Sequence, residues 1–133
     1  MVILNGAPRS GKSTIAEAIG RSLDGPWLNI GVDIARRATP PRYQPGIGLR
    51  PGGERPDLEA FVVAAYAALY DSIAAHCRHG LIVVVDVVHL DSYSRPLGIL
   101  RSSARRLQGL PALFVGVRCP LDVIVARRAA SVG

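Results

Sequence analysis

Apolar residues along the chain form short continuous runs that alternate with longer stretches of helical spacing. The runs are rich in β-branched residues and predict four buried strands, at residues 2–4, 27–32, 81–86 and 113–117. In the longer stretches apolar side chains recur every three or four positions, which predicts helices at residues 12–23, 34–38, 57–79, 97–108 and 121–130. Strands and helices therefore follow one another along the whole chain.

This alternation predicts an α/β fold. Right-handed crossovers between parallel strands place helices on both faces of one sheet, here a parallel sheet of about four strands. Residues 81–86 are almost wholly apolar, which is typical of a strand covered on both faces. A chain of 133 residues can build one core, so we predict a single three-layer α/β/α domain over residues 1–133. Ligands of such folds bind at the carboxyl ends of the strands.

Prolines and glycines crowd residues 39–56 and interrupt this pattern. Such a composition predicts an irregular loop without a regular element. Loops of this length in small domains are usually lids or binding loops, so we expect this one to serve an acceptor pocket or a lid. Arginines surround it and are candidates to contact a substrate; they are Arg36, Arg37, Arg42, Arg50 and Arg55.

The residues between the first strand and the first helix match G-x-x-x-x-G-K-[ST], the phosphate-binding loop, at every fixed position. Gly6 and Gly11 let the backbone curl around phosphate oxygens, and the helix that follows points its positive end at them. Lys12, the only lysine of the chain, would reach the β and γ phosphates and stabilise the transferring group. The nucleotide-binding residues predicted by the motif are Gly6, Ala7, Pro8, Arg9, Ser10, Gly11, Lys12, Ser13 and Thr14.

Strand, loop and helix in this order predict the P-loop NTPase type of α/β/α fold, with ATP as the nucleotide and Mg²⁺ as its metal. The hydroxyl of Ser13 would bind Mg²⁺. Asp86, after four apolar residues, has the Walker B form and would hold Mg²⁺ directly or through water. Asp33 is expected at the end of the second strand, where its carboxylate could accept the proton of an acceptor hydroxyl. Its alternative role is to cap the helical turn that follows.

Further polar residues follow the predicted strands. His89 lies three residues after Asp86, and Arg118 follows the last strand directly, so either side chain could face the same cleft. Arg127 and Arg128 on the final helix could clamp phosphates or could lie at the surface. The sequence leaves these roles open.

The composition of the chain limits the kinds of binding partner that we expect. The net charge of +6 comes from scattered arginines and favours anionic ligands such as nucleotides. An aromatic content of 5% argues against a base-stacking surface for nucleic acid. Cys77 and Cys119 show neither a disulfide framework nor metal spacing, and the first residues already belong to a strand, so we expect a cytoplasmic protein without a signal peptide. The longest apolar run, residues 81–90, is too short to cross a membrane.

Four segments, in the same order, make the chain resemble the chloramphenicol phosphotransferase family of small P-loop kinases. They are residues 3–6 leading into Gly11-Lys12-Ser13, then Pro26-Trp27-Leu28 with Gly31-Val32-Asp33, then residues 83–88, and last Val115-Gly116-Val117-Arg118-Cys119. The resemblance implies ATP-dependent phosphorylation of a primary hydroxyl on chloramphenicol or a similar small molecule. It also implies that Asp33 is the base and that the loop after it helps to form the acceptor pocket.

The chain departs from the family pattern in two places. Val87 stands where the family commonly has a second acidic residue. Family members also continue beyond the position of Gly133 with an arginine-bearing lid, a helix and a final strand, so we expect these parts to be absent from the 133 residues.

Three interpretations follow from the sequence. The first is a kinase that inactivates an antibiotic-like alcohol. The second keeps the kinase and changes the acceptor to a sugar, a nucleotide sugar or a polynucleotide end. The third is a shortened protein that binds nucleotide without turnover. An incomplete sheet edge also leaves a homo-oligomer open.

Overall fold

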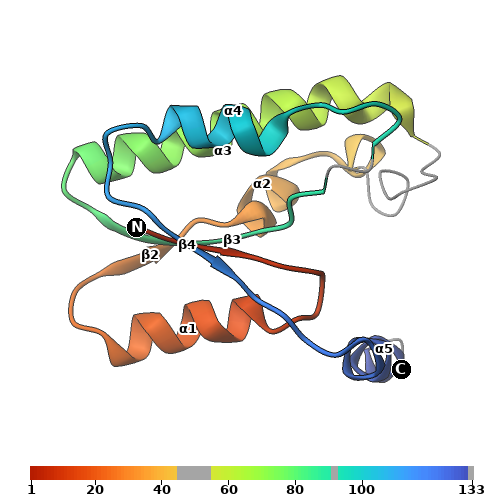
Figure 1. Cartoon of the computed structure of the whole chain (residues 1–133), viewed down its shortest axis with the longest axis horizontal. Helices are drawn as coiled ribbons and strands as arrows, with labels where there is room; N and C mark the ends of the chain where they lie inside the picture. Colours follow the sequence, from red (N-terminus) through yellow and green to blue (C-terminus); the bar gives the residue numbers. More distant parts are fainter. Residues whose placement is uncertain (45–54, 91–92, 132–133) are drawn as a thin grey trace.

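A computed structural model describes residues 1–44, 55–90 and 93–131. Within these residues, four strands form one sheet in the order β2-β3-β1-β4, and every neighbouring pair is parallel (Figure 1). The strands are β1 (Val2–Asn5), β2 (Trp27–Asn29), β3 (Ile82–Val87) and β4 (Leu113–Gly116). This arrangement confirms the predicted α/β fold with its parallel sheet.

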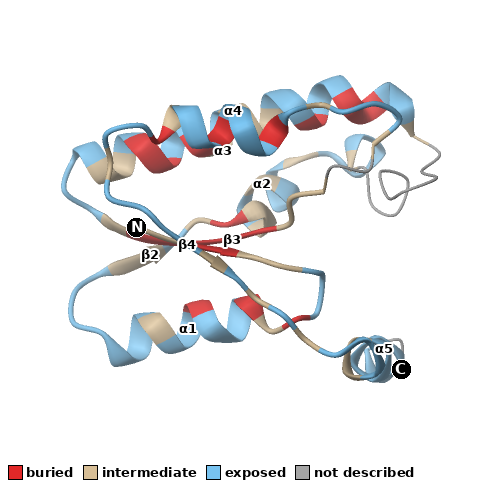
Figure 2. Cartoon of the chain, in the orientation of Figure 1, coloured by how far each residue is buried: buried red, intermediate tan, exposed pale blue. Residues whose placement is uncertain are grey.

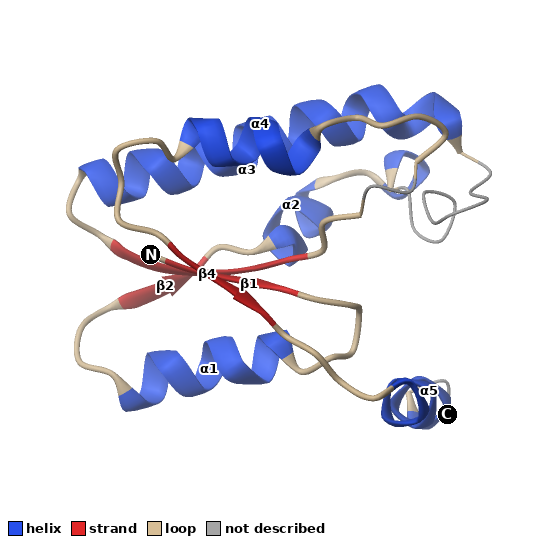
Figure 3. Ribbon diagram, viewed as in Figure 1, coloured by secondary structure: helices blue, strands red, loops and turns tan. Residues whose placement is uncertain are grey.

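Helices cover both faces of the sheet, as the secondary structure in Figure 3 shows. One face carries α1 (Lys12–Ser22), and the other carries α2 (Val32–Ala38), α3 (Glu59–Arg78) and α4 (Ile99–Arg106). The last helix, α5 (Leu121–Ala130), lies to one side, near the end of the chain. Short 3-10 turns, η1 (Pro41–Tyr43) and η3 (Pro56–Leu58), precede and follow residues 45–54, which lie outside the described part.

The sheet order places a crevice between β1 and β3. The chain leaves β1 toward α1 on one face, whereas it leaves β3 toward α4 on the opposite face. Neighbouring strands whose connections diverge in this way open a ligand site at their carboxyl ends. Leu4 pairs with Asp86 and Asn5 with Val87, so the loop after β1 begins beside the end of β3.

Alternation along β3 divides the core into two layers, which Figure 2 shows as buried residues on both sides of the sheet. Val83 and Val85 pack with Tyr70 and Ile73 of α3. Val84 faces the other way and packs in the layer formed with Ala16 of α1. Because side chains alternate along a strand, Asp86 shares the face of Val84 and points toward the start of α1.

The segment Pro56–Arg78, and not residues 81–90, is long and apolar enough to cross a membrane by length and composition. In this structure α3 packs against the sheet, and its side chains Tyr70, Ile73 and Ala74 are almost fully buried. The apolar character of the helix therefore serves the protein core here.

Two expectations about the first half of the chain are wrong. The second strand ends at Asn29, and the residues after Gly31 form α2, so Asp33 lies in the first turn of a helix and not at a strand end. The stretch predicted to lack regular elements contains the 3-10 turn η1, which Pro40 precedes and Pro41 begins. Proline at the first position suits a helical turn because its φ is already fixed.

Candidate functional site

The loop after β1 is closed by its own lysine. Lys12 is only 6% exposed, and its Nζ donates hydrogen bonds to the carbonyl oxygens of Gly6 (2.8 Å) and Ala7 (2.7 Å). A Cβ at Gly6 would overlap the carbonyl oxygen of Val117, so only glycine fits between the loop and the end of β4. Gly11 has a φ of 103°, in the left-handed region that glycine tolerates. The loop therefore has the compact shape that the motif predicts.

A buried hydroxyl inside this loop has no protein partner. Ser10 is 7% exposed, and its Oγ forms no hydrogen bond within the described ranges. A buried hydroxyl without a partner costs free energy, which a bound oxyanion would recover by accepting its proton in a hydrogen bond. The loop thus fits a phosphate group.

Ser13 and Asp86 meet across the crevice. The hydroxyl of Ser13 donates to Oδ2 of Asp86 at 3.0 Å, and Asp86 is only 7% exposed. These oxygen ligands suit Mg²⁺, which usually takes one or two protein ligands together with substrate phosphates and water. Among residues 1–44, 55–90 and 93–131 there is no group of three or more His, Cys, Asp or Glu that could hold a metal by itself.

The link between β2 and α2 passes directly over Asp86. A Cβ at Gly31 would overlap Oδ1 of Asp86 and would lie 2.6 Å from its carbonyl oxygen. The φ of Gly31 is −70°, an ordinary value, so glycine is needed here for space and not for backbone freedom. In the sequence Gly31 stands out only as part of a family motif, and contact with Asp86 is its physical role.

Two carboxylates act on the charge of Lys12. Burial lowers the pKa of Lys12 below its ordinary value, because the charged ammonium loses water. The negative charges of Asp86 and Asp33 partly oppose this shift and raise the pKa. Lys12, Asp86 and Asp33 therefore belong to one electrostatic unit.

Asp33 lies on the opposite wall of the crevice, in the first turn of α2. Its Oδ1 accepts a hydrogen bond from Nε of Arg36 at 3.1 Å, and the side chain is 51% exposed. Its side chain makes no cap hydrogen bond at the start of the helix, where Gly31 holds the N-cap position. Asp33 is thus open to the crevice and is not used as a cap.

A pocket of about 560 Å³ connects these groups. Lys12, Ser13, Asp33 and Asp86 all line it, so the structure brings together the predicted catalytic and metal-binding side chains. Most of the remaining wall is apolar or aromatic and comes from α3 and the segment after β3; it includes Phe61, Val62, Ala65, Tyr66, Leu69, Val88, Leu90 and Tyr93. The pocket wall therefore combines charged groups with a larger apolar part.

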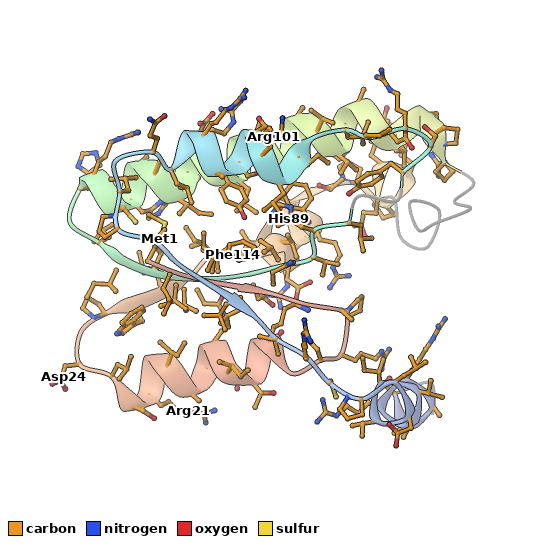
Figure 4. The ribbon with its side chains drawn as sticks, viewed as in Figure 1. Met1, Arg21, Asp24, His89, Arg101 and Phe114 are labelled. Carbon is orange, nitrogen blue, oxygen red and sulfur yellow. The ribbon has the colours of Figure 1, made fainter. Side chains whose placement is uncertain are left out.

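Tyr66 and His89 take part in hydrogen bonds that connect α3, the segment after β3 and the sheet. The hydroxyl of Tyr66 donates to the carbonyl oxygen of Val88 at 2.6 Å, and burial raises the pKa of Tyr66 to about 12, so it stays a donor. The backbone N–H of His89 donates to Oδ1 of Asn5 at 2.9 Å, and its Nε2 lies 2.7 Å from the hydroxyl of Tyr70. Figure 4 shows His89 between the sheet and the helices above it, and it does not line the pocket.

The final helix is tied to the phosphate-binding loop by two arginines. Nη1 of Arg127 donates to the carbonyl oxygen of Arg9, and Nη1 of Arg9 donates to the carbonyl oxygen of Arg127, both at 3.0 Å. Arg9 has a φ of 66° and is the one non-glycine residue with positive φ in the described part of the chain. Nη1 of Arg127 also lies 3.8 Å from the position of a Cβ built on Gly11.

Other candidates from the sequence lie elsewhere. Arg118 is exposed and does not line the pocket, and the same holds for Arg37 and Arg42; Arg55 is half-buried and does not line it either. Arg50 lies outside the described residues. Arg36 does line the pocket, through its pairing with Asp33.

A parallel sheet with this loop at its switch point defines a P-loop kinase fold, and comparison with known proteins agrees. Residues 1–133 match the family described as chloramphenicol phosphotransferase-like protein. The chain therefore belongs to the chloramphenicol phosphotransferase-like family, as the sequence resemblance predicted.

A similar solved structure is that of a sugar kinase from Janibacter sp. HTCC2649 in unliganded form. The match has a TM-score of 0.59 and 20% sequence identity, and it covers 96% of this chain and 65% of that one. At this identity the likeness concerns the fold alone. A comparison with curated protein sequences gave no match.

Proposed function

We propose that this chain is an ATP-dependent kinase that phosphorylates a hydroxyl group of a small molecule such as chloramphenicol. One observation carries the proposal: Lys12, Ser13, Asp86 and Asp33 all line one pocket, in which Ser13 is bonded to Asp86. A nucleotide held by the loop and an alcohol held beside Asp33 would share this pocket.

Each residue would have a distinct part in the transfer. Lys12 would exchange its hydrogen bonds with the carbonyl oxygens of Gly6 and Ala7 for bonds with phosphate oxygens of ATP. Asp33 would accept the proton of the acceptor hydroxyl, since one of its carboxylate oxygens is bonded to Arg36 and the other remains for the substrate. Ser13 and Asp86 would hold Mg²⁺, which offsets the charge of the phosphates when it is bound.

The pocket wall favours an acceptor with an apolar body. Phe61, Leu69 and Tyr66 present carbon-rich surfaces, which suit an aromatic or aliphatic group better than a bare sugar covered by hydroxyls. A sugar would need several polar partners. Thr39, Gln44 and Tyr93 line the pocket, but the α3 side supplies only the hydroxyl of Tyr66, which is already bonded to Val88. This observation favours an alcohol with an apolar body over a simple sugar.

Substitution of Asp33 separates a kinase from a protein that only binds nucleotide. In Asp33→Ala, acceptor phosphorylation should fall by about 100-fold or more, whereas the affinity for ATP measured by calorimetry should stay near that of the wild type. Asp24→Ala is the matched control, because Asp24 lies in the turn before β2, far from the pocket (Figure 4). Unchanged turnover in Asp33→Ala would contradict the role of Asp33. ATP binding by the wild type without turnover of any acceptor would support a non-catalytic binder.

A further inference from the structure

The charged side chains around the pocket differ in their hydrogen-bond partners. Lys12 is bonded to the phosphate-binding loop, and Asp86 is bonded to Ser13. Arg9 donates to the carbonyl oxygen of Arg127. Arg9 lines the pocket from the phosphate-binding loop, whereas Asp33 and Arg36 are the charged pair that lines it from α2.

The geometry of this pair leaves part of Arg36 available. Its Nε donates to Oδ1 of Asp33 at 3.1 Å, and the Arg36 side chain is 62% exposed. Neither Nη nitrogen of Arg36 forms a hydrogen bond with a residue in the described ranges. A guanidinium group is a planar fork that binds carboxylate or phosphate oxygens in pairs, and its Nη donors point away from the chain.

The surroundings of Arg36 would strengthen such a contact. Leu69 and Phe61 line the same pocket, so an acceptor whose apolar body binds there would cover part of the exposed Arg36 side chain, and charge interactions are stronger where water is excluded. Arg36 already contacts Asp33. An acceptor whose hydroxyl is bonded to Asp33 and whose anionic group is bonded to an Nη of Arg36 would therefore carry these two groups only a few covalent bonds apart. The charge of Arg36 between them would reduce the repulsion of the two anions.

We propose that Arg36 is a specificity-determining residue, and that the natural acceptor is an anionic alcohol with a carboxylate or phosphate close to its hydroxyl and an apolar body. This inference rests on the proposed kinase function and names its substrate class. The hydroxyl proton passes to Asp33, the acceptor oxygen bonds to the γ phosphorus of ATP, and the bond from that phosphorus to the β–γ bridging oxygen breaks. The products are the phosphorylated acceptor and ADP.

A matched pair of acceptors tests the proposal. The pair is 3-phenyllactate and its neutral amide, 3-phenyllactamide, which share the aromatic body and the hydroxyl. Aromatic esters of phosphoglycerate extend the set of anionic acceptors. We expect kcat/KM to be about 10-fold or more higher for the carboxylate with the wild-type chain, mostly through a lower KM. Arg36→Gln should remove this preference, and Arg36→Lys should restore only part of it because lysine lacks the fork.

Arg37→Gln is the matched control, because Arg37 is exposed on the same helix and does not line the pocket. It should keep the wild-type preference. A wild-type chain that phosphorylates the neutral alcohols, including chloramphenicol, at least as well as the anionic ones would overturn this inference and leave the kinase function standing. Retention of the preference in Arg36→Gln would overturn it as well. No phosphorylation of any acceptor in the set would count against the proposed function itself, and this inference would fall with it.

Discussion

The backbone of Gly31 lies against the carboxylate of Asp86, so closely that a Cβ on Gly31 would overlap Oδ1. This contact joins the two walls of the pocket. Asp86 belongs to the wall formed by β3 and the phosphate-binding loop, and Gly31 leads directly into the helix that carries Asp33. The position of Asp33 relative to Lys12, Ser13 and Asp86 therefore depends on a glycine that has no functional group.

Adding a methyl group at this contact should destabilise the fold. We expect Gly31→Ala to lower the free energy of unfolding by about 1–3 kcal/mol, because the side chain forces Asp86 or the start of α2 to move. Gly20→Ala in α1 is the control, since a Cβ there meets nothing within 4 Å. That control should be stabilising by about 0.5–1 kcal/mol, because alanine favours helix. Equal stability of Gly31→Ala and wild type in urea unfolding would show that the predicted clash is absent.

The hydrogen bond between Ser13 and Asp86 predicts a metal-dependent defect. Ser13→Ala should raise the Mg²⁺ concentration needed for half-maximal turnover several-fold, because one oxygen ligand is lost. Ser102→Ala removes an exposed hydroxyl on α4 and should leave the Mg²⁺ dependence unchanged. A Ser13→Ala enzyme with the wild-type Mg²⁺ curve would exclude Ser13 as a ligand.

The paired arginines predict that α5 depends on the phosphate-binding loop for its position. No residue of α5 is buried, so the reciprocal hydrogen bonds of Arg9 and Arg127 are a main attachment of that helix. Arg127→Ala should speed amide hydrogen exchange in α5 and in residues 7–11, whereas Arg128→Ala should not. Unaltered exchange in α5 of Arg127→Ala would contradict this attachment.

The hydrogen bonds of Glu59 predict that the stability of the fold depends on pH in the acid range. The hydroxyl and the backbone N–H of Ser94 donate hydrogen bonds to the carboxylate of Glu59 and lower its pKa. These bonds hold the segment after β3 against the start of α3. A lowered pKa in the folded state stabilises the fold at pH values above the unfolded pKa, near 4.5, and this contribution is lost as the pH falls through the folded-state pKa.

Thermal unfolding across the acid range tests this dependence. The stability difference between wild type and Glu59→Gln should be largest at neutral pH and should shrink as the pH falls below about 4.5. Glu17→Gln controls for the loss of one negative charge, because Glu17 lies on the exposed face of α1. A difference between wild type and Glu59→Gln that stays constant with pH would contradict the lowered pKa.

The features predicted from sequence are those with strong local patterns. The short apolar runs identified β1, β3 and β4, and the phosphate-binding loop is readable because its glycines and Lys12 have fixed spacing. The end of β2 was placed too late because Ile30 and Val32 extend the apolar run. The chain must instead turn at Gly31 to pass Asp86, a contact between residues 55 positions apart that no local pattern reports.

Other parts of the site escaped prediction for the same reason. Tyr66 lies among the apolar positions of a long helix, and only the folded chain shows that it lines the pocket and bonds to Val88. The pairing of Arg9 with Arg127 spans 118 residues. A sequence suggests which residues carry charge, but their partners depend on how distant elements meet.

The most direct test of the kinase proposal is a phosphoryl-transfer assay followed by mass spectrometry. The purified chain would be incubated with Mg²⁺, ATP and a set of alcohols that includes chloramphenicol and 3-phenyllactate. We expect a product that is heavier by one phosphate group, formed by the wild type and not by Lys12→Ala, which lacks the only lysine of the chain. Equal product from Lys12→Ala, or no phosphorylated product from any alcohol while ATP still binds, would contradict the kinase proposal.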